Sequence, residues 1–523
     1  MPKAHETKKE SSLSSPLLLL FLVAMLVRGA VLFASLDSFN TDPDSYLKLA
    51  ENWYSYGVLG NHNTPTAFRP PLYPAALKEL VSIRASSERP DVYHAPFTEE
   101  TGKKRLVRRQ ESQSSDPVSD FFDQNVALSR NASIALFHWI LGVSTVILVW
   151  FYARYAGLSP LLALFAGLLV TFDPILLQQS RLIMTETFAA FFAALLLLST
   201  VTVVKRRNSV FSCVGYAFLG ALFGLSTLCR PAFYAFAGLV FINLFFVELA
   251  DLIYKARENK TGNVSRFCGG FFRLVCFLSM CALVVSPWAV RNDRVFGKPI
   301  LTTTHGGYTL YLANNPELYA HYQTSSPFSL WDPEPFHTRR QKDYDVALAD
   351  SNITKGSADE ELFQDDWTRR QAIETIRSKR PTFFYSCAIR FCELWRFLPH
   401  DVSQFEETSR SRSEKTIAGV PLGDFRNYGR YFVAVFYIVE FILAIVGILA
   451  LSLKKTGNFK NNSSGSVFES PLIWGFLLIL SVQAPHLLYW TNMRMRAPLE
   501  VFIPILALLS VTIFRKNRPH VAP

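Results

Sequence analysis

The sequence predicts an all-α polytopic membrane protein with about ten transmembrane helices, on the evidence of composition, run length and charge order. Half of the 523 residues are hydrophobic and only 18% are charged, which excludes a disordered or collagen-like polymer. The apolar residues gather in runs of about 20, the length that crosses a hydrocarbon core about 30 Å thick. Clusters of Lys and Arg then follow alternate runs, as expected of a chain that crosses a bilayer repeatedly.

Ten apolar runs are long enough to span a bilayer. The first follows a basic start, but its length and the lack of a small-residue cleavage site indicate an uncleaved span rather than a signal peptide. The predicted spans are residues 16–36, 134–152, 158–177, 187–204, 211–228, 233–254, 271–290, 431–453, 471–490 and 498–514.

The basic residues predict the orientation of the spans. If the amino terminus is cytoplasmic, every short loop with a Lys or Arg cluster falls on the cytoplasmic side, as the positive-inside rule requires. These clusters include Arg154, residues 205–207, Lys454 with Lys455, and residues 515–518. Both chain ends are therefore expected in the cytoplasm. The net charge of +11 reflects membrane orientation and does not indicate a nucleic-acid partner.

This topology divides the chain into three segments. Residues 1–290 carry the first seven spans and an outer loop at 37–130, residues 291–430 form an outer-face segment, and residues 431–523 carry the last three spans and a cytoplasmic tail. Within the first outer loop, residues 86–120 are rich in charge and Ser, which predicts a mobile insertion. The second outer segment is mixed: a helical pattern over 365–398 carries an apolar stripe that would lie on the membrane surface.

Two carboxylates, Asp42 and Asp44, stand immediately outside the first span. A carboxylate at this boundary can act as a general base on a hydroxyl or amine, or ligate a hard cation. The structural alternative is that one of them caps a helix over residues 45–54. Glu186 stands at the outer end of the fourth span, where it either serves a catalytic cavity or stabilises the first turn of a helix through the macrodipole.

Arginines are the natural partners of an anionic phosphate, because the guanidinium is permanently charged and planar. Outer arginines also extend to lipid headgroups without any catalytic role, so this alternative applies to each of them. The outer-face candidates are Arg69, Arg230, Arg291, Arg494 and Arg496. Arg28 differs because it lies inside the first span, where it should face the bundle interior with Asp173 as a partner.

Several segments together resemble the polyprenyl-phosphate-sugar-dependent glycosyltransferases of the GT-C fold, in the family of protein O-mannosyltransferases and lipid A aminoarabinose transferases. The resemblance lies in the order and common outer-face position of residues 42–46, 69–74, 180–186, 229–231 and 287–292.

The resemblance also implies roles for individual residues. In that family an acidic residue in the first outer loop is essential, usually followed by Glu, with an aromatic residue four positions after it. Asp42 and Tyr46 match this spacing, whereas Pro43 replaces the Glu and leaves Asp44 as a substitute. Glu186 corresponds to a second acidic position at the catalytic cavity, and Arg69 to a basic residue that precedes Pro in the aminoarabinose transferases.

The resemblance implies a GT-C-like transferase that moves a hexosyl or pentosyl group from a polyprenyl-phosphate carrier to an extracytoplasmic protein, lipid or glycan. The expected partners are that donor, the acceptor and membrane lipid, in a plasma (inner) membrane with an outer-face site, or in the endoplasmic reticulum of a eukaryote. No cofactor follows from the residues, although a divalent cation would suit the carboxylates. The alternative is a transporter or lipid flippase, which the embedded Arg28 and Asp173 would also suit.

Overall fold

The computed structural model describes residues 4–61, 64–88, 117–257, 263–326, 328–400, 416–417, 420–454 and 467–516. Most of the predicted mobile insertion, including its basic cluster at residues 103–109, lies outside this described part. Within the described part the chain is mainly helical, with two short antiparallel hairpins. The all-α prediction is confirmed.

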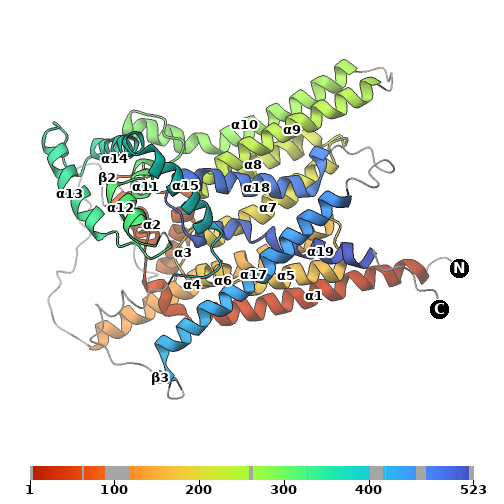
Figure 1. Ribbon diagram of the computed structural model, residues 1–523, viewed down its shortest axis with the longest axis horizontal. Helices are drawn as coiled ribbons and strands as arrows, with labels where there is room; N and C mark the ends of the chain where they lie inside the picture. The colour runs from red at the N-terminus through yellow and green to blue at the C-terminus, as the bar shows by residue number, and fades with distance from the viewer. Residues whose placement is uncertain are drawn as a thin grey trace.

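Eight helices are long and apolar enough to cross a membrane, and they run side by side in one bundle (Figure 1). They are α1 (Ala4–Phe33), α4 (Pro117–Tyr155), α7 (Glu186–Lys205), α8 (Ser212–Cys229), α9 (Ala232–Arg257), α10 (Asn263–Phe296), α17 (Leu422–Lys454) and α18 (Pro471–Leu488). Two bent helix pairs are also long and apolar enough to cross a membrane, if each pair is counted as one span. The first is α5 (Pro160–Phe172) with α6 (Pro174–Ser180), bent by 48°, and the second is η4 (Met493–Leu499) with α19 (Ile503–Lys516), bent by 60°. The described residues therefore contain counterparts of all ten predicted spans.

Proline accounts for the break between α5 and α6. Pro174 has no N–H to donate, and its ring is incompatible with continuing the preceding helix. The side chain of Asp173 begins the next helix, because its Oδ1 accepts the backbone N–H of Leu176 at 2.7 Å. A buried carboxylate therefore stands at the break itself.

The shorter elements gather at one end of the bundle, on the left in Figure 1. They are η1 (Leu36–Asn40), α2 (Tyr46–Tyr56), β1 (Gly60–Asn61), β2 (Thr64–Pro65), α3 (Leu72–Glu88), α11 (Gly306–Ala313), α12 (Pro316–Thr324), α13 (Glu334–Ala349), α14 (Ala358–Ser378) and α15 (Arg380–Leu394). The start of α1 and the end of α19 lie at the opposite end, which agrees with the predicted alternation of loops. The predicted helix over 365–398 is two helices, which meet just before Pro381. The remaining short elements are β3 (Thr416–Ile417), β4 (Val420–Pro421) and η3 (Val467–Glu469).

A small apolar cluster attaches the first outer elements to the bundle. Phe39 of η1, Tyr46 of α2 and Tyr73 of α3 pack with Ile134 of α4 and Ile183, which precedes α7. Polar contacts hold the segment after β2. Glu361 of α14 accepts hydrogen bonds from the hydroxyl of Thr66 at 2.6 Å and from the N–H of Ala67 at 2.8 Å. The apolar cluster holds the elements on either side of Asp42 and Asp44 against Ile183, three residues before the start of α7.

Candidate functional site

Asp42 is held by the first turns of α2. Its Oδ1 accepts the N–H of Tyr46 at 2.9 Å and its Oδ2 accepts the N–H of Lys48 at 3.0 Å. Partial burial raises the pKa of Asp42. The backbone hydrogen bonds lower this pKa, and the nearby charge of Asp44 raises it, but burial has the largest effect. The helix-cap alternative is thus confirmed for Asp42. The turn is strained, since Ser45 has a φ of 61°, a left-handed conformation that few non-glycine residues adopt.

Asp44 is paired with Arg69. The guanidinium Nη2 lies 2.9 Å from Asp44 Oδ1, and Nε donates to the Asp44 carbonyl at 3.2 Å. The same guanidinium lies over the rings of Tyr46 and Phe68, and its Nη1 is 3.5 Å from His305 Nε2. Arg69 therefore holds the backbone and the carboxylate of Asp44 together at the rim of the bundle.

Glu186 forms a second, looser charged group at the start of α7. Its Oε1 lies 3.7 Å from Arg230 Nη2 and 3.8 Å from Arg494 Nε, although the Glu186 side chain is only 2% exposed. Within the described structure, Glu186 Oε2, Arg230 Nη1 and Arg494 Nε have no hydrogen-bond partner. The two guanidinium groups instead donate to the sulfur atoms of Met495 and Met184. Two partly buried cations therefore face one buried carboxylate, and each retains a hydrogen-bond donor without a partner in the described structure.

Tyr46 lies within electrostatic reach of both charged groups. It interacts with Arg69 and Asp44 on one side and with Glu186 and Arg230 on the other. Burial raises the pKa of Tyr46 well above its usual value, so its hydroxyl stays neutral and can donate a hydrogen bond. The sequence identified Tyr46 only by its spacing from Asp42, and nothing in that spacing indicated this position.

Tyr73 and His305 are two further residues that the sequence did not suggest. Tyr73 packs edge-on against Tyr46 with ring centres 5.3 Å apart, and its hydroxyl lies 2.8 Å from His138 Nε2. His138 Nδ1 lies 2.7 Å from the carbonyl of Ser180, which assigns the proton to Nδ1 and makes Nε2 the acceptor. Burial and, to a lesser extent, the nearby charge of Arg69 together lower the pKa of His305 to about 3, so His305 is neutral near pH 7.

Two of the candidate arginines have other tasks. Arg291 donates to the carbonyls of Thr66 and Leu59 at 2.9 and 3.0 Å, and so fixes the β1–β2 hairpin. Arg496 is fully buried and pairs with Glu500, Nε to Oε1 at 2.5 Å. The structure brings Arg230 and Arg494 to Glu186, and Arg69 to Asp44, but it does not bring Arg291 or Arg496 to either group.

Arg28 faces the bundle interior, as predicted, and is 3% exposed. Its Nη2 donates to the carbonyl of Val170 at 2.7 Å, and Asp173 adds an electrostatic attraction. Among the described residues, Asp42, Asp44 and Glu186 do not converge as a set of metal ligands, because each has its own protein partners. The outer site is therefore described through its own side chains alone.

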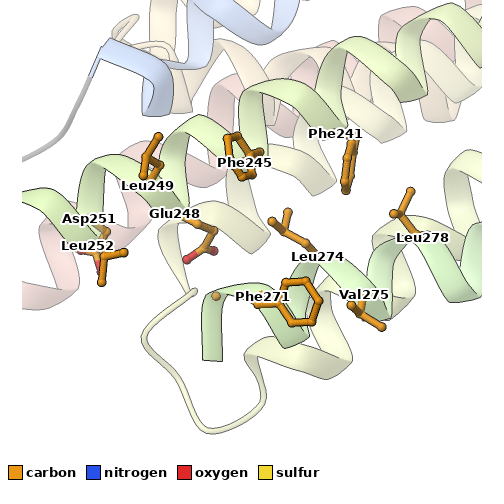
Figure 2. A pocket seen from close by; sticks show the side chains of 11 residues that line it. Phe241, Phe245, Glu248, Leu249, Asp251, Leu252, Phe271, Leu274, Val275 and Leu278 are labelled. Carbon is orange, nitrogen blue, oxygen red and sulfur yellow. The ribbon is translucent and has the colours of Figure 1, made fainter. Parts of the chain in front are cut away.

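Two large hollows open on the bundle surface. One, of about 600 Å³, lies between α2, α3, α8 and α10 near the outer end, and Trp53, Leu72, Leu228 and Trp288 are among its lining residues. The other, of about 420 Å³, lies between α9 and α10 (Figure 2). It is lined mainly by apolar side chains, and its Glu248 is paired with Arg273. Of these two hollows the first is the nearer to the Glu186 group along the chain, because its lining residue Leu228 is two residues before Arg230.

Comparison with known proteins gives a family match and distant structural likenesses. Residues 117–296, which include Glu186 and Arg230, match the family model described as dolichyl-phosphate-mannose-protein mannosyltransferase. The oligosaccharyltransferase AglB from Archaeoglobus fulgidus, in complex with an inhibitory peptide and a dolichol-phosphate, is similar over 96% of this chain and 50% of that chain, at 13% identity and a TM-score of 0.46. ArnT from Cupriavidus metallidurans, bound to undecaprenyl phosphate, is similar over 95% of this chain and 78% of that chain, at 14% identity and a TM-score of 0.33.

The chain thus spans half the length of AglB. No curated protein matches it. The family match covers the second to seventh spans, and so includes Glu186 and two of the arginines that the sequence nominated, Arg230 and Arg291. The match of residues 117–296 to this family model confirms the family resemblance found in the sequence.

Proposed function

We propose that the chain is a membrane glycosyltransferase that takes a sugar from a polyprenyl-phosphate carrier and transfers it to an acceptor on the non-cytoplasmic face. The observation that carries this proposal is the Glu186 group, in which two partly buried guanidiniums share one buried carboxylate and retain unused donors. The family match over this part of the chain supports it. The acceptor is a protein, a lipid or a glycan.

Arg230 and Arg494 are the proposed phosphate ligands. When the bond between the sugar and the carrier phosphate breaks, negative charge develops on the phosphate oxygens, and fixed donors in a dry site stabilise that charge. Arg230 Nη1 and Arg494 Nε have no protein acceptor in the described structure, so a phosphate can take their hydrogen bonds without displacing one. Arg69 is a third cation at the same rim, already paired with Asp44.

The hollow beside α8 is the proposed place for the first isoprene units of the carrier. Its lining is mainly apolar. Most of the lining residues come from α2, α3, α10 and the end of α8, the helix that ends just before Arg230. A chain of isoprene units gains about 25 cal/mol for each Å² of apolar surface that leaves water at this boundary. The phosphate would then lie at the rim, within the bilayer headgroup region.

The loop from Asp42 to Tyr46 is the proposed acceptor side of the reaction. Arg69 holds Asp44 at the rim, where its carboxylate can orient or deprotonate the acceptor nucleophile. Both carboxylate oxygens of Asp42 accept hydrogen bonds from backbone N–H groups of α2. The main contribution of Asp42 is therefore to hold this loop in its strained conformation. Tyr46, between the two charged groups, is placed to donate a hydrogen bond to the sugar or the phosphate.

A donor-turnover assay tests the proposal. The purified full chain in nanodiscs is given radiolabelled dolichyl- or undecaprenyl-phosphate mannose, with water or short Ser/Thr peptides as acceptors. We expect Glu186→Gln and Asp44→Asn each to lower turnover by about 100-fold or more, the usual scale for a lost acid–base or electrostatic group. Asp42→Asn should have a smaller effect.

The matched control is Glu469→Gln, which changes a glutamate at the opposite end of the bundle and should leave turnover unchanged. Unchanged turnover in Asp42→Asn, Asp44→Asn and Glu186→Gln alike, each with native-like gel filtration, would reject the proposed site. A native chain that cleaves none of the polyprenyl-phosphate sugars supplied would reject the proposed donor class.

A further inference from the structure

A second group of carboxylates lies inside the bundle, away from the outer rim. Asp173 stands at the break between α5 and α6, Glu500 at the break between η4 and α19, and Glu440 in the middle of α17. The three side chains are buried, and their carboxylate oxygens lie within 4.8 Å of one another. Because α19 packs against both α5 and α17, and η4 packs against α6, the two bent spans meet at this group (Figure 1).

The protein supplies partners for only part of this group. Asp173 accepts the N–H of Leu176 with Oδ1 and the hydroxyl of Tyr437 with Oδ2, at 2.7 and 3.1 Å. Glu500 Oε1 accepts Arg496 Nε at 2.5 Å. Neither oxygen of Glu440, which is 3% exposed, has a hydrogen-bond partner in the described structure, and neither has Glu500 Oε2.

The charges of the group do not balance. Three carboxylates have one guanidinium in ion-pair contact, that of Arg496 with Glu500, and Arg28 adds an electrostatic attraction to Asp173, so the fully ionised group still keeps a net negative charge inside the membrane. A buried charge without a counter-charge is strongly unfavourable, and an intramembrane carboxylate normally has a partner. Tyr437 adds a neutral oxygen at the same place.

A divalent cation would supply both what the unpartnered oxygens lack and the positive charge that the group lacks. Carboxylate and hydroxyl oxygens are the ligands that hard divalent ions prefer, and two positive charges neutralise the group. Broken membrane helices are also where cations are commonly held, because the interrupted backbone frees polar groups at membrane depth. Glu440 is the indispensable ligand in this arrangement, since both of its oxygens are buried in the group without a protein partner.

We propose that Asp173, Glu440 and Glu500 bind a divalent cation within the bundle and thereby join the two bent spans to α17. This site shares no carboxylate with the outer site, so the inference is independent of the proposed sugar transfer. It does bear on the outer site through η4, which directs Arg496 into this group and Arg494, two residues earlier, toward Glu186. A bound ion would therefore hold η4, and with it Arg494, in a fixed position relative to Glu186.

Binding of Mn²⁺ alone tests the site. The full chain is purified in detergent with a chelator, the chelator is removed, and free Mn²⁺ is measured by EPR during titration. We expect a single bound Mn²⁺ that is lost in Glu440→Gln and in Asp173→Asn. Glu186→Gln and Glu469→Gln, which remove a carboxylate at the outer rim and at the cytoplasmic end, should both keep it.

The native chain gives a second measurement that needs no variant. An ion enclosed by Asp173, Glu440 and Glu500 holds little exchangeable water, so bound Mn²⁺ should show little line broadening in ¹⁷O-enriched water. An ion at the outer rim would be well hydrated and strongly broadened. The inference is overturned if the chain binds no Mn²⁺, if the bound ion is strongly broadened, or if Glu186→Gln abolishes binding while Glu440→Gln keeps it. The first result would mean that protons neutralise the group.

Discussion

The ion pairs differ between the two ends of the bundle, which the charge pattern predicts to be cytoplasmic and outer. At the cytoplasmic end, Arg207 makes a two-pronged pair with Glu469, both contacts at 2.8 Å, and Arg273 holds Glu248 through Nε and Nη2. At the outer end, the guanidiniums of Arg230 and Arg494 stand 3.7 and 3.8 Å from Glu186, beyond hydrogen-bonding distance.

Close pairing and loose pairing serve different purposes. A bidentate arginine–carboxylate pair uses its hydrogen bonds within the protein and so holds helices together. A buried charge with unused donors costs stability in the free protein, and such a cost is typical of sites that a ligand completes. We therefore propose that the pairs at the predicted cytoplasmic end are scaffold and that the predicted outer rim is a binding site, and the following tests address this proposal.

Removal of an outer arginine should affect turnover most. Arg230→Gln is expected to lower donor turnover by about 100-fold, which corresponds to about 2.7 kcal/mol of transition-state stabilisation. Its thermal unfolding midpoint should change little, because Arg230 makes no close hydrogen bond to Glu186. Single-turnover kinetics on the native chain and the variant measure the effect, and Arg291→Gln is the comparison, since Arg291 is committed to the β1–β2 hairpin. A large loss of stability in Arg230→Gln with near-native turnover would mean that Arg230 serves the scaffold and not a binding site.

Removal of a cytoplasmic arginine should have the opposite pattern. Arg273→Met removes both guanidinium hydrogen bonds to Glu248 and leaves it only the hydroxyl of Tyr216, so it should lower the free energy of unfolding by about 2 kcal/mol, the usual cost of lost hydrogen bonds to a charged group. Turnover per folded molecule should stay near native. Thermal unfolding in detergent gives the first quantity, and the donor assay at a temperature below both midpoints gives the second. Equal stability of Arg273→Met and the native chain would show that this pair is not scaffold.

The sequence was sufficient for the spans and insufficient for the pairings. Bilayer thickness sets the length of an apolar run, and the alternation of Lys and Arg clusters sets the order of loops, so all ten spans could be located. The breaks at Asp173 and Glu500 were not predicted. They depend on how prolines, a capping carboxylate and neighbouring helices combine in three dimensions.

The same limit applies to the candidate site. Charge type and position at the outer boundary were enough to nominate Glu186, Arg230 and Arg494. Arg291 and Arg496 have the same sequence character, yet their partners are backbone carbonyls and Glu500, which only the packing determines. Tyr73 and His305 were missed because a buried polar aromatic has no sequence pattern that separates it from ordinary core.

His305 should make the outer rim sensitive to acid. The unfolded chain takes up a proton at its histidines near pH 6.5, whereas burial and Arg69 keep His305 in the folded chain neutral down to about pH 3. Stability from this group is therefore complete above about pH 6.5 and is lost as the pH falls below it, by about 1 kcal/mol for the first pH unit. Thermal unfolding of the native chain and of His305→Asn across this range measures the difference. Identical slopes for the two proteins would show that His305 is protonated freely in the folded chain.

The strain at Ser45 should give the smallest effect, and it refines the comparison further. A left-handed conformation costs a non-glycine residue about 1 to 2 kcal/mol, and glycine loses part of that gain to its greater freedom in the unfolded chain. Ser45→Gly is therefore expected to raise stability by about 0.5 kcal/mol while it loosens the turn that joins Asp42 to Tyr46. Ser45→Ala retains the strain and is the matched control. If the strain serves to hold Asp44 at the rim, Ser45→Gly should unfold later and turn over donor more slowly than Ser45→Ala. Faster turnover in Ser45→Gly would mean that the conformation is a by-product of capping by Asp42 and not part of the site.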